Sequence, residues 1–202
     1  MGRVLTAIAP REPEAHGLLA LMELNASRTA ARIDAAGEPI LLLDQNRALW
    51  DQLQIRRGLL ALGRARELGG AGGVYALQAA IIACHAQART ANDTDWSRIA
   101  SLYAELAAAL PSPIIELNRA VAVGMAEGPE EGLVIVDRLV SVPALKAYHL
   151  LPSVRGDLLH KLGRHEEARA AFEAAAALAG NRRENDLLRR RAAEAADAAM
   201  SS

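Results

Sequence analysis

The chain has 202 residues and a formal net charge of −1, with 51% hydrophobic and 3% aromatic residues. Domains that bind nucleic acid by themselves usually carry a basic excess for phosphates and aromatic side chains that stack on bases, so this composition argues against direct nucleic-acid binding. Alanine and leucine dominate; both favour helices, and the length is sufficient for one sizeable core.

Helix start and stop signals recur along the chain. Ser112 before Pro113, and Asp44 before residues 45–47, can cap helix starts, while the glycine-rich residues 69–73 form a break. The segment 33–43 has a turn centre between apolar residues and predicts a small β-hairpin or an ordered loop. The predicted helices span residues 13–33, 44–67, 74–88, 95–110, 113–126, 129–140, 144–161, 164–179 and 182–198.

The predicted helices form antiparallel pairs with short connections, which suggests a structural repeat. Large apolar residues recur at Tyr103, Val136 and Phe172, and small residues such as Gly156 and Ala168 accompany the last of them, as in a TPR unit. We therefore predict one all-α domain over residues 1–202, a right-handed, TPR-like solenoid of stacked helix pairs. The last helix should cap the stack with a polar outer face.

Motifs that carry chemistry are missing from the sequence. The five histidines have no helical metal-binding spacing, and there is no nucleophile elbow or phosphate-binding loop. Cys84 is the single cysteine, so no internal disulfide can form, and no apolar run has the ~20 residues of a membrane span. We expect a cytoplasmic protein that is not an enzyme and holds no cofactor or metal.

Polar residues and both tryptophans are dense in the first half of the chain. Either they serve as caps and internal ion pairs, with Asp93 as an N-cap and Arg47–Asp51 as a helical pair, or they form a groove that receives a partner. A small-molecule pocket would require several of them to converge on one cavity. The candidate residues are Arg28, Arg32, Asp44, Gln45, Arg47, Trp50, Asp51, Gln78, His85, Asp93, Asp95 and Trp96, followed later in the chain by Asn118 and Arg119.

Several of these segments resemble a known family. Residues 17–22, 42–51, 75–86, 93–96 and 117–122, followed by the final TPR-like unit, resemble in this order the TPR-like, SnoaL-lacking C-terminal extension of bacterial extracytoplasmic-function (ECF, sigma-24-like) sigma factors. The resemblance covers nearly the whole chain. Asn46 departs from the pattern, because an acidic residue is common at that position in the family.

The resemblance implies a regulatory domain that controls sigma activity in transcription initiation by contact with its own sigma modules in cis or with RNA polymerase. Sigma regions 2 and 4, which read the −10 and −35 promoter elements, are absent from these residues, so we expect an excised C-terminal domain. Small YCII-like (DGPF) proteins are further candidate partners; DNA and membranes are not. The alternative is a stand-alone, TPR-like scaffold that binds a protein or peptide.

Overall fold

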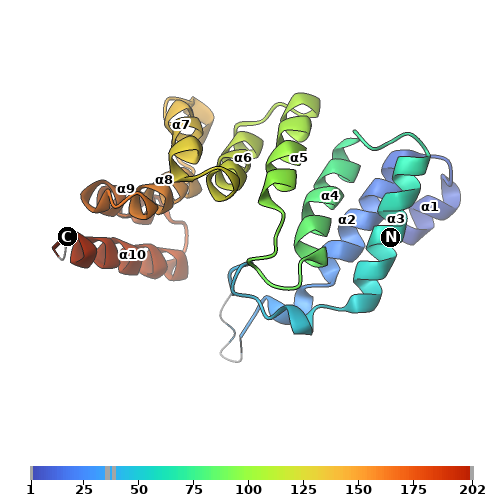
Figure 1. The fold of residues 1–202 in the computed structure, drawn as a ribbon, viewed down its shortest axis with the longest axis horizontal. Helices are drawn as coiled ribbons and strands as arrows, with labels where there is room; N and C mark the ends of the chain where they lie inside the picture. Colours follow the sequence, from blue (N-terminus) through green and yellow to red (C-terminus); the bar gives the residue numbers. More distant parts are fainter. Residues whose placement is uncertain (1, 35–36, 38–39, 201–202) are drawn as a thin grey trace. The chain divides into compact units, whose positions relative to one another are not determined.

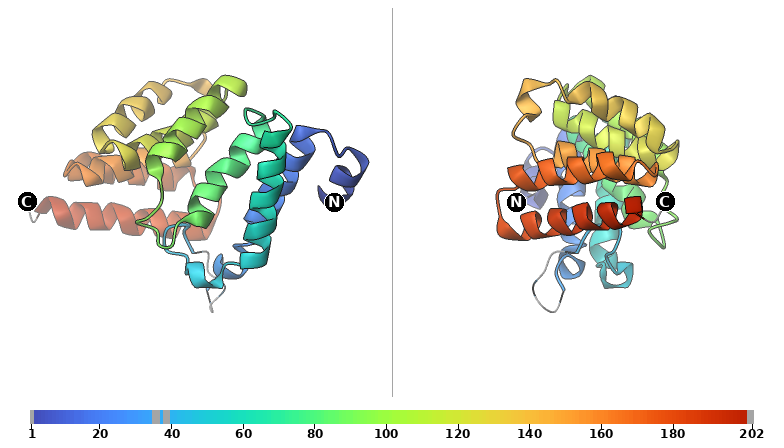
Figure 2. Two further views of the ribbon diagram at one scale, coloured as in Figure 1. Left: turned by 45° about the vertical axis from the view of Figure 1, so that its right-hand side comes forward. Right: turned by 90° about the vertical axis from the view of Figure 1, so that its left-hand side faces the viewer.

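The computed structural model describes residues 2–34, 37 and 40–200, and these residues confirm the predicted all-α class. They contain ten α-helices, three short 3₁₀ helices and no strand. The chain divides into two compact units, residues 1–111 and residues 112–202. Within each unit, helices that follow one another along the chain pack side by side, as expected for a helical solenoid (Figures 1 and 2).

The first unit is centred on α2, which packs against α1, α3 and α4, while α4 also packs against α5 (Figure 1). Two 3₁₀ helices, η1 (Thr29–Ala31) and η2 (Arg47–Leu49), lie in the long connection between α2 and α3. The five α-helices are α1 (Gly2–Ile8), α2 (Pro13–Ala26), α3 (Gln52–Glu67), α4 (Val74–Gln87) and α5 (Trp96–Ala109).

In the second unit each helix packs against the next one along the chain, from α6 to α10. The 3₁₀ helix η3 (Pro143–Leu145) precedes α8 and also contacts α6. No helix among the described residues of either unit has both the length and the apolar character needed to cross a bilayer. The five α-helices are α6 (Pro113–Ala126), α7 (Pro129–Leu139), α8 (Leu150–Lys161), α9 (His165–Leu178) and α10 (Arg182–Met200).

Small residues bring the helix axes close together. A Cβ atom added to Gly17 would lie 2.8 Å from the backbone nitrogen of Ala76, and one added to Gly132 would lie 2.8 Å from the carbonyl oxygen of Ala120. A Cβ on Gly156 would lie 2.8 Å from the Phe172 ring. Gly156, one of the small residues of the predicted TPR-like unit, therefore lies where its helix touches the helix that carries Phe172.

The last helix, α10, is held onto the second unit partly by polar contacts. Leu188, Ala192 and Ala195 form its buried stripe. Arg191 places its guanidinium 4.7 Å from the centroid of the buried Phe172 ring and forms an ion pair with Asp157 of α8. The predicted terminal helix with one polar face is thus present, and one of its arginines covers the large apolar residue of the preceding pair.

Three of the predicted helix boundaries are wrong. The helix predicted for 13–33 ends at Ala26, and the helix predicted for 144–161 begins at Leu150 after the 3₁₀ turn η3. The helix predicted for 44–67 begins at Gln52, because Asp51 and not Asp44 accepts hydrogen bonds from the first free backbone amides, those of Leu53 and Gln54. Helix α1 was not predicted, since residues 1–12 carry no helix start signal.

The described part of segment 33–43 is an ordered loop with an isolated bridge at Ile33, and it contains no strand. The Ile40 amide donates to the Arg32 carbonyl at 2.8 Å, and the Gly37 amide donates to the Asp34 carbonyl at 3.1 Å. We predicted either a small β-hairpin or an ordered loop here, and the described residues form the ordered loop. Residues 35, 36, 38 and 39 lie outside the described part of the chain.

Two alanine substitutions test the importance of close helix approach. Gly17→Ala should lower the free energy of unfolding by about 1–3 kcal/mol, because the new methyl group meets the α4 backbone. Gly63→Ala, on the open side of α3 with no atom within 4 Å, should raise it by about 0.5–1 kcal/mol through helix propensity. Urea unfolding followed by circular dichroism measures both, and equal effects would contradict the packing argument.

Candidate functional site

Arg47 joins the loop before α3 to the end of α4. Its Nη1 donates to the carbonyl oxygens of His85 and, at 3.1 Å, Ala88, while its Nη2 donates to the Thr94 hydroxyl at 3.1 Å. Carbonyls at the C-terminal end of a helix lack partners within that helix, and a cation there also interacts favourably with the helix dipole. Arg47 therefore fixes the position of η2 against the α4–α5 connection.

Trp50 lies at the centre of this polar cluster and is 3% exposed. The guanidinium carbons of Arg47 and Arg28 lie 5.2 Å and 5.9 Å from its ring centroid, within cation–π range. Arg28 and Arg32 both donate to the Oδ1 atom of Asn25, at 3.5 Å and 3.3 Å. Both arginines lie within the helix predicted for residues 13–33, but α2 ends at Ala26, so no shared helix face holds them. Asn25 brings them together instead.

His85 forms the α4 side of the cluster. Its ring meets the Trp96 ring edge-on, with centroids 5.2 Å apart and planes at 77°, and only 6% of the residue is exposed. Burial, followed by the positive charges of Arg47 and Arg28, lowers the pKa of His85 from 6.5 to about 4. The imidazole is therefore neutral at pH 7.

The aspartates around the cluster cap helices and turns. Asp51 caps α3, and Asp95 caps α5 by accepting from the Arg98 amide at 2.9 Å. Asp93 accepts from both the amide and the hydroxyl of Thr90. The prediction that Asp93 is an N-cap is therefore wrong, and Asp95 caps α5 instead.

The predicted ion pair between Arg47 and Asp51 is absent from the described residues. A 3₁₀ turn ends at Leu49, and Trp50 is extended, so no continuous helix places Asp51 one turn after Arg47. Side chains four residues apart face each other only on a regular helix. Arg47 reaches instead to residues far away along the chain.

The remaining predicted residues stand apart from the Trp50 cluster. Gln45 is buried and donates to the Ile40 carbonyl at 3.1 Å, Asp44 is exposed, and Gln78 donates to the Val74 carbonyl within its own helix. In the second unit, Asn118 is exposed and Arg119 pairs with Glu116 at 2.8 Å. The structure thus brings together Arg28, Arg32, Arg47, Trp50, His85 and Trp96.

The sequence argument missed three residues that organise the cluster. Asn25 accepts from two arginines, buried Thr94 accepts from Arg47, and the Ser27 carbonyl accepts from the Asp51 amide at 2.9 Å. The contacts of Asn25 have a weak signal in the sequence, because Arg28 and Arg32 follow it by three and seven residues. Nothing in the sequence points to Thr94 or Ser27, because their partners come from other elements.

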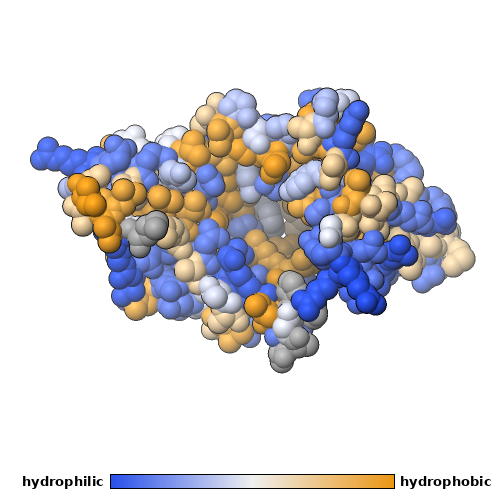
Figure 3. Space-filling model, turned by 180° about the vertical axis from the view of Figure 1, so that it is seen from behind, coloured by the Kyte–Doolittle hydropathy of each residue, from blue (hydrophilic) through white to orange (hydrophobic). Residues whose placement is uncertain are grey.

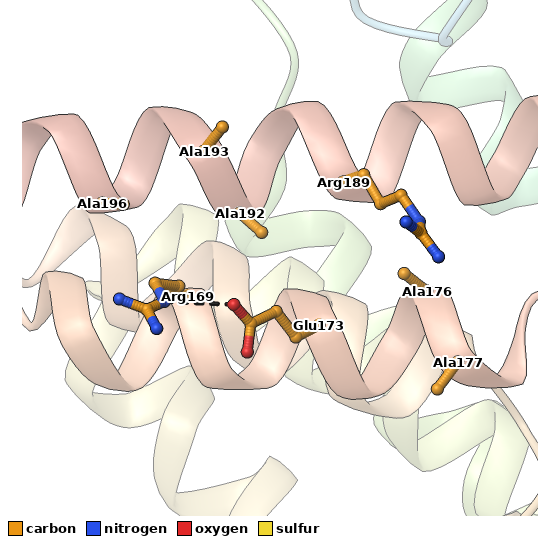
Figure 4. Close-up of a pocket in the computed structure, with 8 residues that line it drawn as sticks. All are labelled: Arg169, Glu173, Ala176, Ala177, Arg189, Ala192, Ala193 and Ala196. Carbon is orange, nitrogen blue, oxygen red and sulfur yellow. Dashed lines mark hydrogen bonds and ion pairs between the residues drawn. The ribbon is translucent and has the colours of Figure 1, made fainter.

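A groove of about 510 Å³ runs between α9 and α10 in the second unit (Figure 4). Its lining is mostly alanine, including Ala176, Ala192 and Ala196, and charged side chains frame it: Arg169 and Glu173 from α9, which pair at 3.1 Å, and Arg189 from α10. Alanine linings allow another helix to approach closely, while the charges at the border restrict its orientation.

Apolar residues are exposed over α1 in the first unit. Val4 and Ile8 are 62% and 76% exposed, and orange residues gather at this edge of the space-filling view (Figure 3). A groove of about 380 Å³ lies between α1, α2 and α3, and its lining includes Arg3, Arg57 and the exposed Leu60. Exposed apolar side chains next to a groove are typical of surfaces that contact another protein.

Parts of this chain are similar to a protein family and to one bacterial protein. A family of unknown function, DUF6596, matches residues 1–66. An uncharacterized protein of Rhizobium meliloti (strain 1021) is 44% identical over 189 residues, which are 94% of this chain and 44% of the relative. The chain therefore spans less than half the length of this relative. No solved structure matches the chain.

Replacing Arg47 should loosen the loop before α3. Arg47→Gln removes hydrogen bonds to two helix-end carbonyls and to Thr94, so the free energy of unfolding should fall by roughly 2 kcal/mol. Arg56→Gln, at an exposed position on α3, is the matched control and should change it by less than about 0.5 kcal/mol. Urea unfolding measures both variants. If the free energy of unfolding of Arg47→Gln equalled that of the native chain, Arg47 would not hold the loop in place.

His85 should make stability depend on pH. Its pKa is about 4 in the folded state, against 6.5 for an unperturbed histidine, so the unfolded chain binds a proton first as the pH falls. Stability present above pH 6.5 should therefore be lost progressively towards pH 4, by up to roughly 3 kcal/mol. Urea unfolding midpoints should be measured between pH 6.5 and pH 4. As the pH is lowered, the midpoint of His85→Asn should fall less steeply than that of the native chain; an equally steep fall for both proteins would count against this explanation.

Proposed function

We propose that this chain is the C-terminal regulatory domain of an ECF sigma factor and controls sigma activity in transcription initiation through protein contacts. The observation that carries the proposal is the order of the family-like segments, from residues 17–22 to the final TPR-like unit, which covers nearly the whole chain. The stacked helix pairs support it, since such repeats commonly present surfaces for protein recognition.

The length of the R. meliloti relative also supports a role within a larger protein. Its matched region is 44% of its length, so more than half of that protein lies outside the match. This remainder offers room for the two modules that recognise the −10 and −35 promoter elements. We propose that the matched region contacts those modules in cis or contacts RNA polymerase, in the cytoplasm and without catalysis.

The surfaces suit protein partners better than nucleic acid. The formal charge of −1 provides no basic excess for a phosphate backbone. By contrast, the apolar residues of α1 and the alanine-lined groove between α9 and α10 fit contact with protein surfaces. Small YCII-like (DGPF) proteins remain candidates for a second partner on the basis of the family resemblance.

Transcription in vitro tests the proposal. The full-length R. meliloti relative should bind core RNA polymerase and start transcription from a promoter that it recognises. Deleting the region matched by this chain should change the transcript yield several-fold, because the deleted domain no longer contacts the sigma modules. Adding this chain in trans should shift the yield of the truncated protein back towards that of the full-length protein.

A denatured and refolding-blocked preparation of this chain serves as the control for the addition experiment. Failure of the relative to bind core polymerase would remove the sigma assignment. Binding of this chain to a peptide or protein outside the transcription machinery would then favour a stand-alone scaffold. Normal transcription that does not respond to the deletion would remove the regulatory role while leaving the sigma assignment in place.

A further inference from the structure

Within the described residues, Arg28 and Arg47 lack the acidic partner that several other arginines have. Within the described residues neither has a carboxylate at salt-bridge distance, although both guanidiniums lie beside the same Trp50 ring. Both guanidinium groups therefore lie against one buried ring, and neither forms an ion pair within the described residues. Within the described part of the chain, arginines paired with Asp or Glu include Arg3, Arg64, Arg98, Arg119, Arg155, Arg164, Arg169, Arg182 and Arg191.

Several buried polar atoms of this cluster have no hydrogen-bond partner within the described residues. The Nε atoms of Arg28 and Arg47 are buried without a hydrogen-bond partner in the described part of the chain, as are Trp50 Nε1 and His85 Nδ1. Burial lowers the pKa of both arginines, and Arg32 lowers that of Arg28 further. Because arginine stays protonated even so, the cluster keeps its positive charge.

The two arginines are fixed to different degrees. Arg47 is held by two carbonyls and the Thr94 hydroxyl, whereas the guanidinium of Arg28 makes a single hydrogen bond within the described residues, at 3.5 Å to Asn25. Asp93 is the acid whose charge acts on Arg47, but its Oδ2 is engaged by the amide and hydroxyl of Thr90. Arg28 therefore has free donors, with Arg47 as a fixed charge nearby.

We propose that Arg28 and Arg47, together with Trp50, form a binding site for an oxyanion. The guanidinium fork binds carboxylate and phosphate groups through paired, charge-assisted hydrogen bonds, and a partly buried position strengthens these bonds relative to water. Arg28 would bind the anion, and Arg47 would add a fixed charge. If the proposed function holds, the natural anion is an Asp or Glu side chain of the protein partner, and this identification rests on that function.

Anion titration of the whole chain tests the site without any sigma factor. Phosphate and acetate are added separately at constant ionic strength, with chloride as the balancing ion, and the two indole N–H signals are followed by NMR. Trp96→Phe assigns the Trp50 signal. Both anions should shift this signal along a saturable curve, and Arg28→Gln should weaken binding at least tenfold.

Two further variants separate charge from geometry. Arg28→Lys keeps the charge but loses the planar fork, so it should bind the anions several-fold more weakly than the native chain. Arg64→Gln, on the exposed Arg64–Glu67 pair, is the matched control and should bind like the native chain. A linear, unsaturated shift, or equal affinities for native chain and Arg28→Gln, would overturn the site.

Thermal unfolding distinguishes this site from a structural role for Arg28. Arg28→Gln removes a partly buried charge that has no ion-pair partner, so in chloride its melting temperature should equal or exceed that of the native chain. Phosphate should raise the melting temperature of the native chain but not that of Arg28→Gln. A clearly lower melting temperature in chloride would make Arg28 a structural residue and overturn the proposal. Binding of phosphate without acetate would keep the oxyanion site but overturn an acidic side chain as its occupant.

Discussion

Helices in this chain come so close together that at several contacts only a hydrogen atom fits between the backbones. Gly17 lies against the backbone of Ala76, and Gly132 lies against Ala120 and Gly124. With so few aromatic side chains, each pair of helices buries apolar surface mainly by close approach of alanine and leucine faces. The positions of the connecting loops, and of the polar residues that they carry, follow from this spacing.

The long connection between α2 and α3 has too few buried apolar residues to hold itself in place. Trp50 anchors its end in the core, and Arg47 reaches across to carbonyls at the end of α4. The polar residues of this connection therefore fall into two groups: those that hold the fold together and those that lack the partners for such a role. Arg47, Asp51 and Thr94 organise the fold, whereas Arg28 lies at the same ring without an equivalent set of partners.

The sequence predicted helices where the signal was local. Pro113 and Pro129 occupy first turns and Ser112 caps α6, so both helix starts were predicted correctly. The start of α3 was placed wrongly because Asp44 and Asp51 are equally good caps in sequence, and the buried Trp50 decides between them. The partners of Arg47 were not predictable, because backbone carbonyls from a distant helix leave no trace in residue identity.

The attachment of α10 affects how the second unit comes apart. Its buried stripe is narrow, and Arg191 forms both the cover of the Phe172 ring and the ion pair with Asp157. Ion pairs weaken in salt, whereas apolar burial does not. Detachment of this helix should therefore depend on salt, and it would uncover the Phe172 ring. Amide hydrogen exchange along residues 182–200 would then be faster at high ionic strength, with little change in α7.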